Sequence, residues 1–174
     1  DFVVKSGTIP VTDPLQGVYI AMNNGNYAMR RYDALTDSAG ISPTWFGVVP
    51  DAGTDQSAGV QATIDYAQTA TSRGLAINFP AGSFIFSCTD SGSHGIKITG
   101  AGLSNTVFTS AIQNEFCLRL ERNFRTAIIR DIQFDGKDKL KHGLYANIGS
   151  ELRCEYVEFE NHGLGLVVNS TINC

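Results

Sequence analysis

Hydrophobic and polar positions repeat near the end of the chain with two superimposed rhythms. The segment HGLYANIGSELRC (142–154) aligns with HGLGLVVNSTINC (162–174), and every second position agrees in type, whereas the positions between them, apart from Gly143 and Gly163, differ. An alternation with a period of two indicates extended backbone with one buried face. The spacing of 20 residues between the segments adds a longer repeat, which is typical of a solenoid whose turns stack strand upon strand. The pattern predicts an all-β parallel β-helix.

Other architectures with short repeats fit this pattern less well. A strand, a helix and a crossover need about 30 residues, and a leucine-rich repeat would show an LxxLxL core with a helical half. A chance alignment of two short segments is the remaining alternative. Against it, Ile132 and Phe134 match Val157 and Phe159 at a spacing of 25 residues. The extra residues fall in the polar stretch GKDKLK (136–141), and solenoids tolerate such insertions at the corners of a turn.

The first part of the chain has a different pattern. FVVKS (2–6), GVYIAM (17–22) and NYAMRRY (26–32) alternate as short strands, and the last two flank an Asn-Asn-Gly sequence typical of an antiparallel hairpin. ALTDSAGISP (34–43) is a linker by its Gly, Ser and Pro content. The sequence therefore predicts two parts, a small β neck and linker module over residues 1–44 and a β-helix over residues 45–174.

One amphipathic helix is expected at the start of the β-helix. Val60, Ile64, Ala67 and Thr71 recur at helical intervals within residues 58–72, and Gly74 follows where a helix would end. Either Asp55 or Ser57 is available as the N-cap. Because the first turn of a solenoid would otherwise expose its core and unpaired backbone, we interpret this helix as a cap.

The other end of the predicted β-helix has no comparable cover. The repeat is interrupted at Cys174, and one turn alone buries too few side chains to offset the backbone entropy of ordering it. We therefore expect further turns, or other subunits, to cover this end.

Composition and charge exclude several classes of protein. Apolar residues make up 43% of the chain and charged residues 17%, with a net charge of −4. No apolar run approaches the roughly 18 residues of a membrane span, so membrane insertion is not expected. A nucleic-acid partner is not expected either, because phosphate binding requires clustered Lys and Arg. The chain opens on DFVVKSG without a Met or a visible signal peptide, which suggests a fragment or a processed product.

The cysteines and histidines do not have the spacing of a metal site. Cys154 and Cys174 occupy equivalent places in the repeat, so we expect them to stack about 4.8 Å apart as reduced, buried thiols. Side chains in register on parallel strands point the same way, which disfavours a disulfide. His142 and His162 should stack similarly, but the pattern offers no third ligand. We predict no metal and no cofactor.

Several motifs in residues 45–87 resemble those of a known family. They are Trp45-Phe46-Gly47, then Asp51, Gly53, Thr54 and Asp55, then Val60-Gln61, and finally Phe79-Pro80-Ala81-Gly82 with Phe84. This combination, together with GIKITGAGLSNTVF (95–108), resembles the N-terminal part of the pectate-lyase-like, right-handed β-helix family of bacteriophage tailspikes. NYAMRRYDALTDSAGISPTWFG (26–47) is similar to the neck that precedes the β-helix in such spikes. The chain departs from the pattern at Ala52, Gln56 and Ser57, in a segment that is structural in the family.

The resemblance implies a homotrimeric spike on a phage tail, outside the host cell, in which this chain supplies the neck and the first turns of the β-helix. A tail or baseplate protein would hold the spike through residues that precede Asp1. The β-helix would bind a bacterial surface polysaccharide, capsule or O-antigen, and in its full-length form usually cleaves it by hydrolysis or β-elimination. The catalytic carboxylates of the family usually sit on later turns, so this chain is expected to lack the active site.

Glycoside hydrolysis needs two carboxyl groups about 5 to 9.5 Å apart. The candidates on the outer surface are five side chains on two adjacent turns: Glu155, Glu158, Glu160, Asp131 and Asp135. Charged residues also keep the outside of a sheet soluble, and this interpretation is the simpler one. No catalytic residue is assigned. Three functions stay open: a depolymerase spike, a spike that only binds, and a secreted bacterial polysaccharide lyase or hydrolase.

Overall fold

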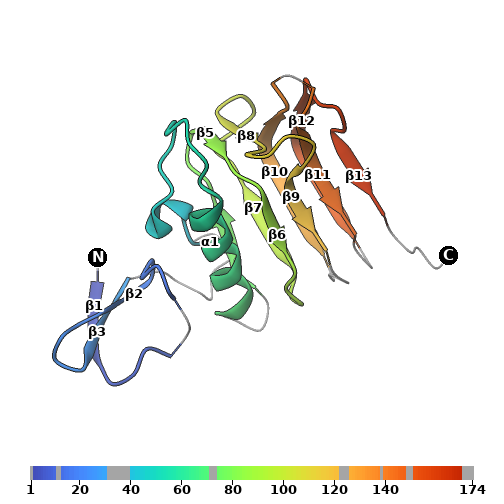
Figure 1. The fold of residues 1–174 in the computed structure, drawn as a ribbon. Coiled ribbons are helices and arrows are strands. Elements are labelled where there is room, and N and C mark those ends of the chain that lie inside the picture. Colours follow the sequence, from blue (N-terminus) through green and yellow to red (C-terminus); the bar gives the residue numbers. More distant parts are fainter. Residues whose placement is uncertain are drawn as a thin grey trace.

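The computed structural model describes residues 2–10, 13–30, 40–70, 74–121, 126–137, 139–147 and 151–169. Parallel strands stack into a solenoid of about three turns, preceded by an antiparallel sheet and an α-helix (Figure 1). The elements are β1 (Phe2–Ser6), β2 (Tyr19–Ala21), β3 (Asn26–Arg30), the 3-10 helix η1 (Pro43–Phe46), α1 (Ser57–Thr69), β4 (Ala76–Asn78), β5 (Gly82–Ile85), β6 (Cys88–Asp90), β7 (Ile96–Thr99), β8 (Thr106–Thr109), β9 (Phe116–Leu120), β10 (Ala127–Asp135), β11 (His142–Ala146), β12 (Leu152–Glu160) and β13 (Leu166–Val168).

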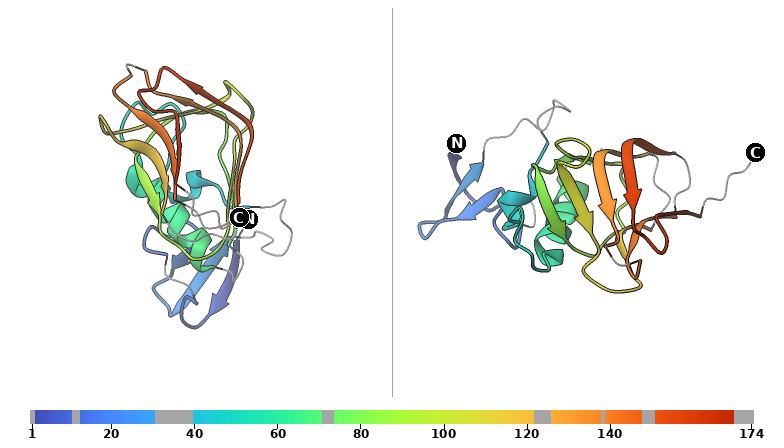
Figure 2. Two further views of the ribbon diagram at one scale, coloured as in Figure 1. Left: turned by 90° about the vertical axis from the view of Figure 1, so that its right-hand side faces the viewer. Right: turned by 90° about the horizontal axis from the view of Figure 1, so that it is seen from above.

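The solenoid has three faces, each a stack of parallel strands. Face A contains β4, β7 and the first halves of β10 and β12, and face B contains β5, β8 and their second halves. Face C contains β6, β9, β11 and β13. The long strands turn from face A to face B at Asp131 and Tyr156, whose φ angles are 58° and 52°. Seen along the stack, the faces surround the core (Figure 2, left).

Each face contributes at least one ladder of inward side chains in register. Face A aligns Ile77, Ile98, Ile129 and Cys154. Face B aligns four phenylalanines, Phe84, Phe108, Phe134 and Phe159, and face C aligns Cys88, Leu118, Leu144 and Leu166. The predicted matches of Ile132 with Val157 and of Phe134 with Phe159 are confirmed.

The predicted register of 20 residues between the last two turns is wrong. Leu144 pairs with Leu166 rather than with Leu164, two residues earlier. Leu164 lies at the preceding corner, 49% exposed, and its carbonyl accepts a hydrogen bond from the Gly143 N–H at 3.0 Å. Because side chains alternate with a period of two, a shift of two residues leaves every side chain on its original face. The alternation alone therefore cannot distinguish the two registers.

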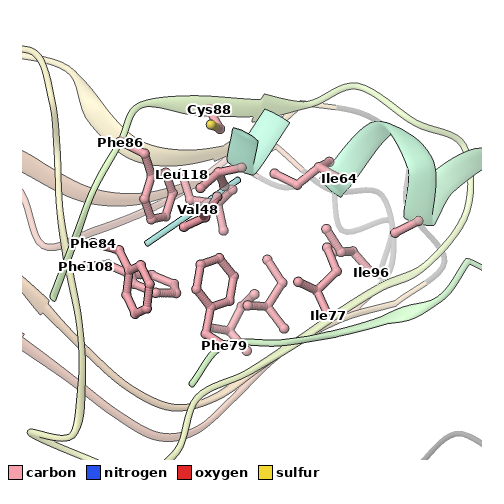
Figure 3. Close-up of a cluster of buried hydrophobic side chains, with 14 of the residues drawn as sticks. Val48, Ile64, Ile77, Phe79, Phe84, Phe86, Cys88, Ile96, Phe108 and Leu118 are labelled. Carbon is pink, nitrogen blue, oxygen red and sulfur yellow. The ribbon is translucent and has the colours of Figure 1, made fainter. Parts of the chain in front are cut away.

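Phenylalanine rings fill the middle of the solenoid (Figure 3). Phe108 makes edge-to-face contacts with Phe79, Phe84, Phe86 and Phe134 at centroid distances of 4.6, 6.1, 4.9 and 5.6 Å. All five rings are at most 4% exposed. Such pairs add about 0.5–1.5 kcal/mol each beyond the burial of their area, so this cluster joins the first three turns.

Preceding segments cover the free edges of the first turn on two faces. On face A, Ile41 pairs with Ile77, and its N–H donates to the Ala76 carbonyl at 2.8 Å. On face B, Asp51 exchanges two hydrogen bonds with Ser83, one from backbone to backbone at 3.0 Å and one to its carboxylate at 2.8 Å. Unpaired backbone groups at these edges would otherwise be buried at a cost.

Helix α1 covers the third edge, on face C, with side chains. The Gln61 amide donates to the Thr89 carbonyl at 2.8 Å and accepts from the Thr89 N–H at 3.0 Å, as a neighbouring strand would. Ser57 accepts from the Ser87 N–H at 2.9 Å. The prediction that a helix covers the first turn is therefore confirmed. The helix covers it by supplying hydrogen-bond partners to the backbone of β6 and of Ser87.

The ends of the helix differ from the prediction. The N-cap position belongs to Gln56, which makes no side-chain cap bond, and not to Asp55 or Ser57. Asp55 nonetheless accepts from the Ser57 N–H at 2.8 Å, while the Gln56 side chain accepts from the Val49 N–H at 2.7 Å. Thr71 lies outside the described residues.

The predicted short strands near the N-terminus form a three-stranded antiparallel sheet in the order β1-β3-β2. Tyr19 packs against Tyr66 of α1 at a centroid distance of 6.3 Å, which places the sheet against the capped end of the solenoid (Figure 2, right). Residues 34–39 of the predicted linker lie outside the described residues. In the described part of the chain, no helix is long and apolar enough to cross a membrane.

At the opposite end, the inward positions of β12 and β13 are only partly covered by the described residues. Leu166 and Val168 are 42% and 49% exposed, whereas Leu144 and Ala146, their partners on β11, are fully buried. That further turns or other subunits cover this end stays a prediction.

Replacing the central ring of face B should destabilise the fold. We expect Phe108→Ala to lower the free energy of unfolding by about 3–5 kcal/mol, because the surrounding rings cannot close the cavity. Phe159→Ala, in the same ladder but half-buried, should cost clearly less. Urea unfolding of the two variants measures the difference, and equal losses would contradict the model of a core centred on Phe108.

Removing the Gln61 amide should open the edge of β6. We expect Gln61→Ala to lower the free energy of unfolding by about 1–3 kcal/mol, because the two backbone groups of Thr89 lose their partner. Gln133→Ala is the matched control, because it removes an exposed hydrogen bond from a side-chain amide to Glu160. It should have a smaller effect. Amide hydrogen exchange at Thr89 should accelerate only in the first variant; unchanged protection there would exclude the proposed role of Gln61.

Candidate functional site

The five candidate carboxylates fall into two groups, separated by the corner at Asp131. Asp135, Glu158 and Glu160 lie on face B and are here called the acidic patch. Glu155 lies on face A and Asp131 at the corner itself. The structure therefore brings three of the five predicted side chains together on one face.

The acidic patch is hydrogen-bonded to side-chain amides. Asp135 and Glu160 are partners on adjacent strands, which places their Cα atoms about 4.8 Å apart. Asp135 accepts from the Asn161 amide at 3.3 Å and from the Lys137 N–H at 2.9 Å. Glu160 accepts from the Gln133 amide at 2.9 Å and is exposed. This is the arrangement of a solvated sheet surface, and a catalytic role for the patch stays a prediction.

The other two carboxylates form surface ion pairs. Asp131 lies 3.6 Å from Arg130, and Glu155 lies 3.8 Å from Arg153. Exposed pairs of this kind contribute about 0–1 kcal/mol. They keep the outer surface of face A charged and soluble.

A cluster that the sequence analysis missed lies on face C. Phe116 and Arg119 on β9 meet His142 and Tyr145 on β11, and we call these four residues with Glu115 and Glu121 the aromatic–arginine cluster. The ring of Phe116 lies 5.1 Å from that of His142 and 5.4 Å from that of Tyr145. The cluster thus spans two adjacent turns.

The guanidinium of Arg119 organises the cluster. Its central carbon lies 4.7 Å from the centroid of Tyr145 and 5.7 Å from that of Phe116. Glu121 accepts from its Nε at 2.7 Å and pairs with Nη2 at 2.6 Å, while Glu115 lies 3.6 Å from Nη1. Two rings and two carboxylates therefore fix this side chain, of which a third is still exposed.

The cluster could not be found in the sequence, because the sequence does not specify which residues of β9 and β11 lie side by side. Tyr145 falls at one of the intervening positions of the 20-residue repeat, where the two segments differ. Its partner Arg119 lies on a strand one turn earlier, and the turns differ in length. An outward aromatic residue facing an outward arginine could have been a signal only after the registers were known.

The three cysteines within the described residues, Cys88, Cys117 and Cys154, are free thiols. The predicted burial of Cys154 is wrong, whereas its stacking on Cys174 stays a prediction. Cys154 is exposed and stacks on Ile129, and Cys174 lies outside the described residues. Burial raises the pKa of the Cys88 thiol to about 12 and that of Cys117 well above its usual range. These two behave as small apolar residues, not as nucleophiles.

The histidines do not form a metal site in the described part of the chain. His142 aligns with Phe116, and its Nδ1 accepts from the Leu164 N–H at 3.3 Å. Nδ1 of His162 lies 3.2 Å from the Lys141 carbonyl. Among the residues that the structure describes, no three His, Cys, Asp or Glu side chains could hold a metal ion.

One carboxylate, Asp90, is buried under helix α1. It is 1% exposed and accepts from the Gly92 N–H at 2.9 Å and from the Gln68 amide at 3.0 Å. Burial raises the pKa of Asp90 to about 6, and the nearby charge of Asp65 adds to this, while the two hydrogen bonds lower it. Because Gln68 also accepts from the His94 N–H at 3.1 Å, Asp90 belongs to the contact between the helix and the first turn.

An open groove of about 430 Å³ runs beside α1, between the helix and the loop at Pro14 and Leu15. Ala58, Ala62 and Tyr66 contribute to its lining, which is mostly apolar. A specific small-molecule site would also need several converging polar groups. Of the arrangements described, the aromatic–arginine cluster offers the best-defined polar geometry.

Comparison with protein-family models, with curated proteins and with solved structures gives no match to this chain.

The buried Asp90 should make stability depend on pH. Its folded pKa of about 6 lies above the ordinary value of 3.8, so its stabilising contribution is full below the ordinary value and is lost as the pH rises through 6. The complete loss should be roughly 3 kcal/mol, at about 1.36 kcal/mol per pKa unit, and most of it should occur between about pH 4 and 7. Asp90→Asn does not titrate, so it should gain stability relative to the wild type over that range. Chemical unfolding at several pH values tests this, and parallel profiles would contradict it.

Proposed function

We propose that this chain is the N-terminal part of a bacteriophage tailspike that binds a bacterial surface polysaccharide, capsule or O-antigen, during host recognition. In its full-length form the spike depolymerises that polysaccharide, by hydrolysis or β-elimination. It acts outside the host cell, as a component of the phage tail.

The observation that carries the proposal is where the family-like motifs lie in the fold. Phe46 of the Trp-Phe-Gly motif is 3% exposed and packs on Tyr66 of α1 at a centroid distance of 5.7 Å. Gly59 allows this close approach, since a Cβ there would lie 2.8 Å from the Phe46 carbonyl oxygen. Asp51 and Gln61 form hydrogen bonds with the first turn, and Phe79 packs on Phe84 inside it. The motifs therefore lie together at the first turn, and all of them help to close it. This shared location supports a common origin with spike β-helices.

We also propose the handedness of the solenoid, the role of the N-terminal sheet and the oligomeric state. A right-handed sense is supported by the general rule that about 98% of parallel crossover connections are right-handed. The antiparallel sheet β1-β3-β2 packs beside the capped end, which is where the neck of a spike would lie. We propose a homotrimer, attached to a tail or baseplate protein on the neck side.

The shape of the solenoid suits a linear polymer. Outward side chains on adjacent strands recur about every 4.8 Å along the stack, a spacing comparable to the rise of one sugar unit. A rigid surface of this kind can contact several consecutive units of a chain without reorganising. Such contact requires no catalytic carboxylates, so a spike that binds without cleaving is the second candidate function.

Incubation with purified bacterial capsules and O-antigens tests the proposal. We expect the full-length protein to bind at least one of these polymers and to shorten it, as size-exclusion chromatography would show. Binding without shortening would favour the binding-only spike. Absence of binding to every polymer, including those of strains on which the phage grows, would overturn the proposal.

A further inference from the structure

The geometry points to a carbohydrate subsite on face C, formed by Phe116, Arg119 and Tyr145, that takes a neutral, hydroxyl-rich stretch of polysaccharide. This inference rests on the proposed function, since it assumes that the chain binds a polysaccharide. It adds the place of contact and the chemical class of the sugar.

The contacts within the cluster are formed without a ligand. The guanidinium of Arg119 is in contact with two rings and two carboxylates, at the distances given above. The Phe116 and Tyr145 rings contact each other at 5.4 Å across two turns. Binding therefore orders few additional rotamers, which lowers the entropic cost of association.

The cluster also has the two kinds of surface that a neutral sugar can contact, namely hydrogen-bonding groups and an apolar surface. The side chains of Arg119, Glu115 and Glu121 are 33%, 48% and 37% exposed, so that hydroxyl groups can reach donors and acceptors side by side. The Phe116 and Tyr145 rings are half-buried, and their accessible parts provide an apolar surface for the C–H groups of a sugar ring. A small patch thus combines apolar contact with hydrogen bonding.

Acidic sugars fit this patch poorly. An acidic sugar is recognised best by an arginine whose paired N–H groups are free. Here Glu121 occupies Nε and Nη2, and Glu115 lies beside Nη1. A carboxylate on the ligand would have to displace one of these glutamates, and it would be repelled by the other. A neutral sugar can instead add its hydroxyl groups without breaking the pairs.

The register gives the direction of the bound chain. Thr89, Arg119, Tyr145 and Val167 align on β6, β9, β11 and β13, which lie side by side in Figure 1. Their row crosses the strands and follows the axis of the solenoid. A polysaccharide lying on this row would run along the axis and contact successive turns with successive sugars.

Binding measurements on a panel of purified capsules and O-antigens test the inference, with half of the polymers built only of neutral sugars and half containing uronic or sialic acids. We expect the wild-type full-length protein to bind one or more neutral polymers. Tyr145→Ala and Arg119→Gln should weaken that binding about 10-fold or more, equal to about 1.4 kcal/mol. The matched control is Tyr156→Ala, at a corner residue that is 74% exposed, and it should bind as the wild type does.

A second measurement keeps the inference testable if either substitution impairs folding. Trp45, the chain's one tryptophan, packs against the core at the capped end, so an added tryptophan can report on the cluster. Fluorescence of Tyr145→Trp should change when the neutral polymer is added, and that of Tyr156→Trp should not.

The outcomes separate the two levels of the proposal. If the wild type binds a neutral polymer while Tyr145→Ala and Arg119→Gln bind it equally well, or if Tyr145→Trp gives no signal, the subsite is wrong and the proposed function stands. Binding confined to acidic polymers would overturn the assigned sugar class. If no polymer binds at all, the proposed function falls, and the subsite with it.

Discussion

The closed edge of the first turn is the constraint on which the rest of the fold depends. A stack of parallel strands can grow only from an edge whose backbone groups are satisfied on one side. Ile41, Asp51 and Gln61 satisfy that side on faces A, B and C in turn. Each uses a different device, namely a strand-like bridge, a carboxylate and a helix-borne amide. Once these edges are closed, each later turn finds a template below it, and the inward side chains pack on those of the turn before.

Inside the stack, the fold constrains the face on which a side chain lies more than its position in the sequence. The phenylalanine ladder of face B keeps one residue type on four successive strands, although the corners between them differ in length. A corner can gain residues without changing the ladder, provided that the strand resumes with the same parity. The difference between the predicted partner of Leu144, Leu164, and the observed one, Leu166, follows the same rule, because the two positions have the same parity.

This rule also explains how much could be predicted from the sequence. The N-terminal hairpin, the capping helix and the pairing of β10 with β12 follow from local patterns: an Asn-Gly turn, helical spacing and alternation with matching residues. Strand β6 gives a weak signal in the sequence because Cys88–Asp90 has only three residues and one of its inward positions is an aspartate. The hydrogen bonds on its other edge come from Gln61, far away in the sequence. The meeting of Arg119 with Tyr145 could not be predicted, because it depends on the lengths of the intervening corners. Of the five predicted carboxylates, three share a face because they follow the one register that the sequence did specify.

The outward side chains, which the stacking of the strands does not constrain, are the ones available for function. The ladders fix where each outward side chain stands, and they do so whatever that side chain is. Thr89, Arg119, Tyr145 and Val167 occupy equivalent places in one row and yet share no chemistry, in contrast to the phenylalanines of the core. Their differences are not needed for stacking, since any residue compatible with a strand would serve there. A position that the fold leaves free but fills with a guanidinium held between two rings and two carboxylates is therefore where recognition is best sought.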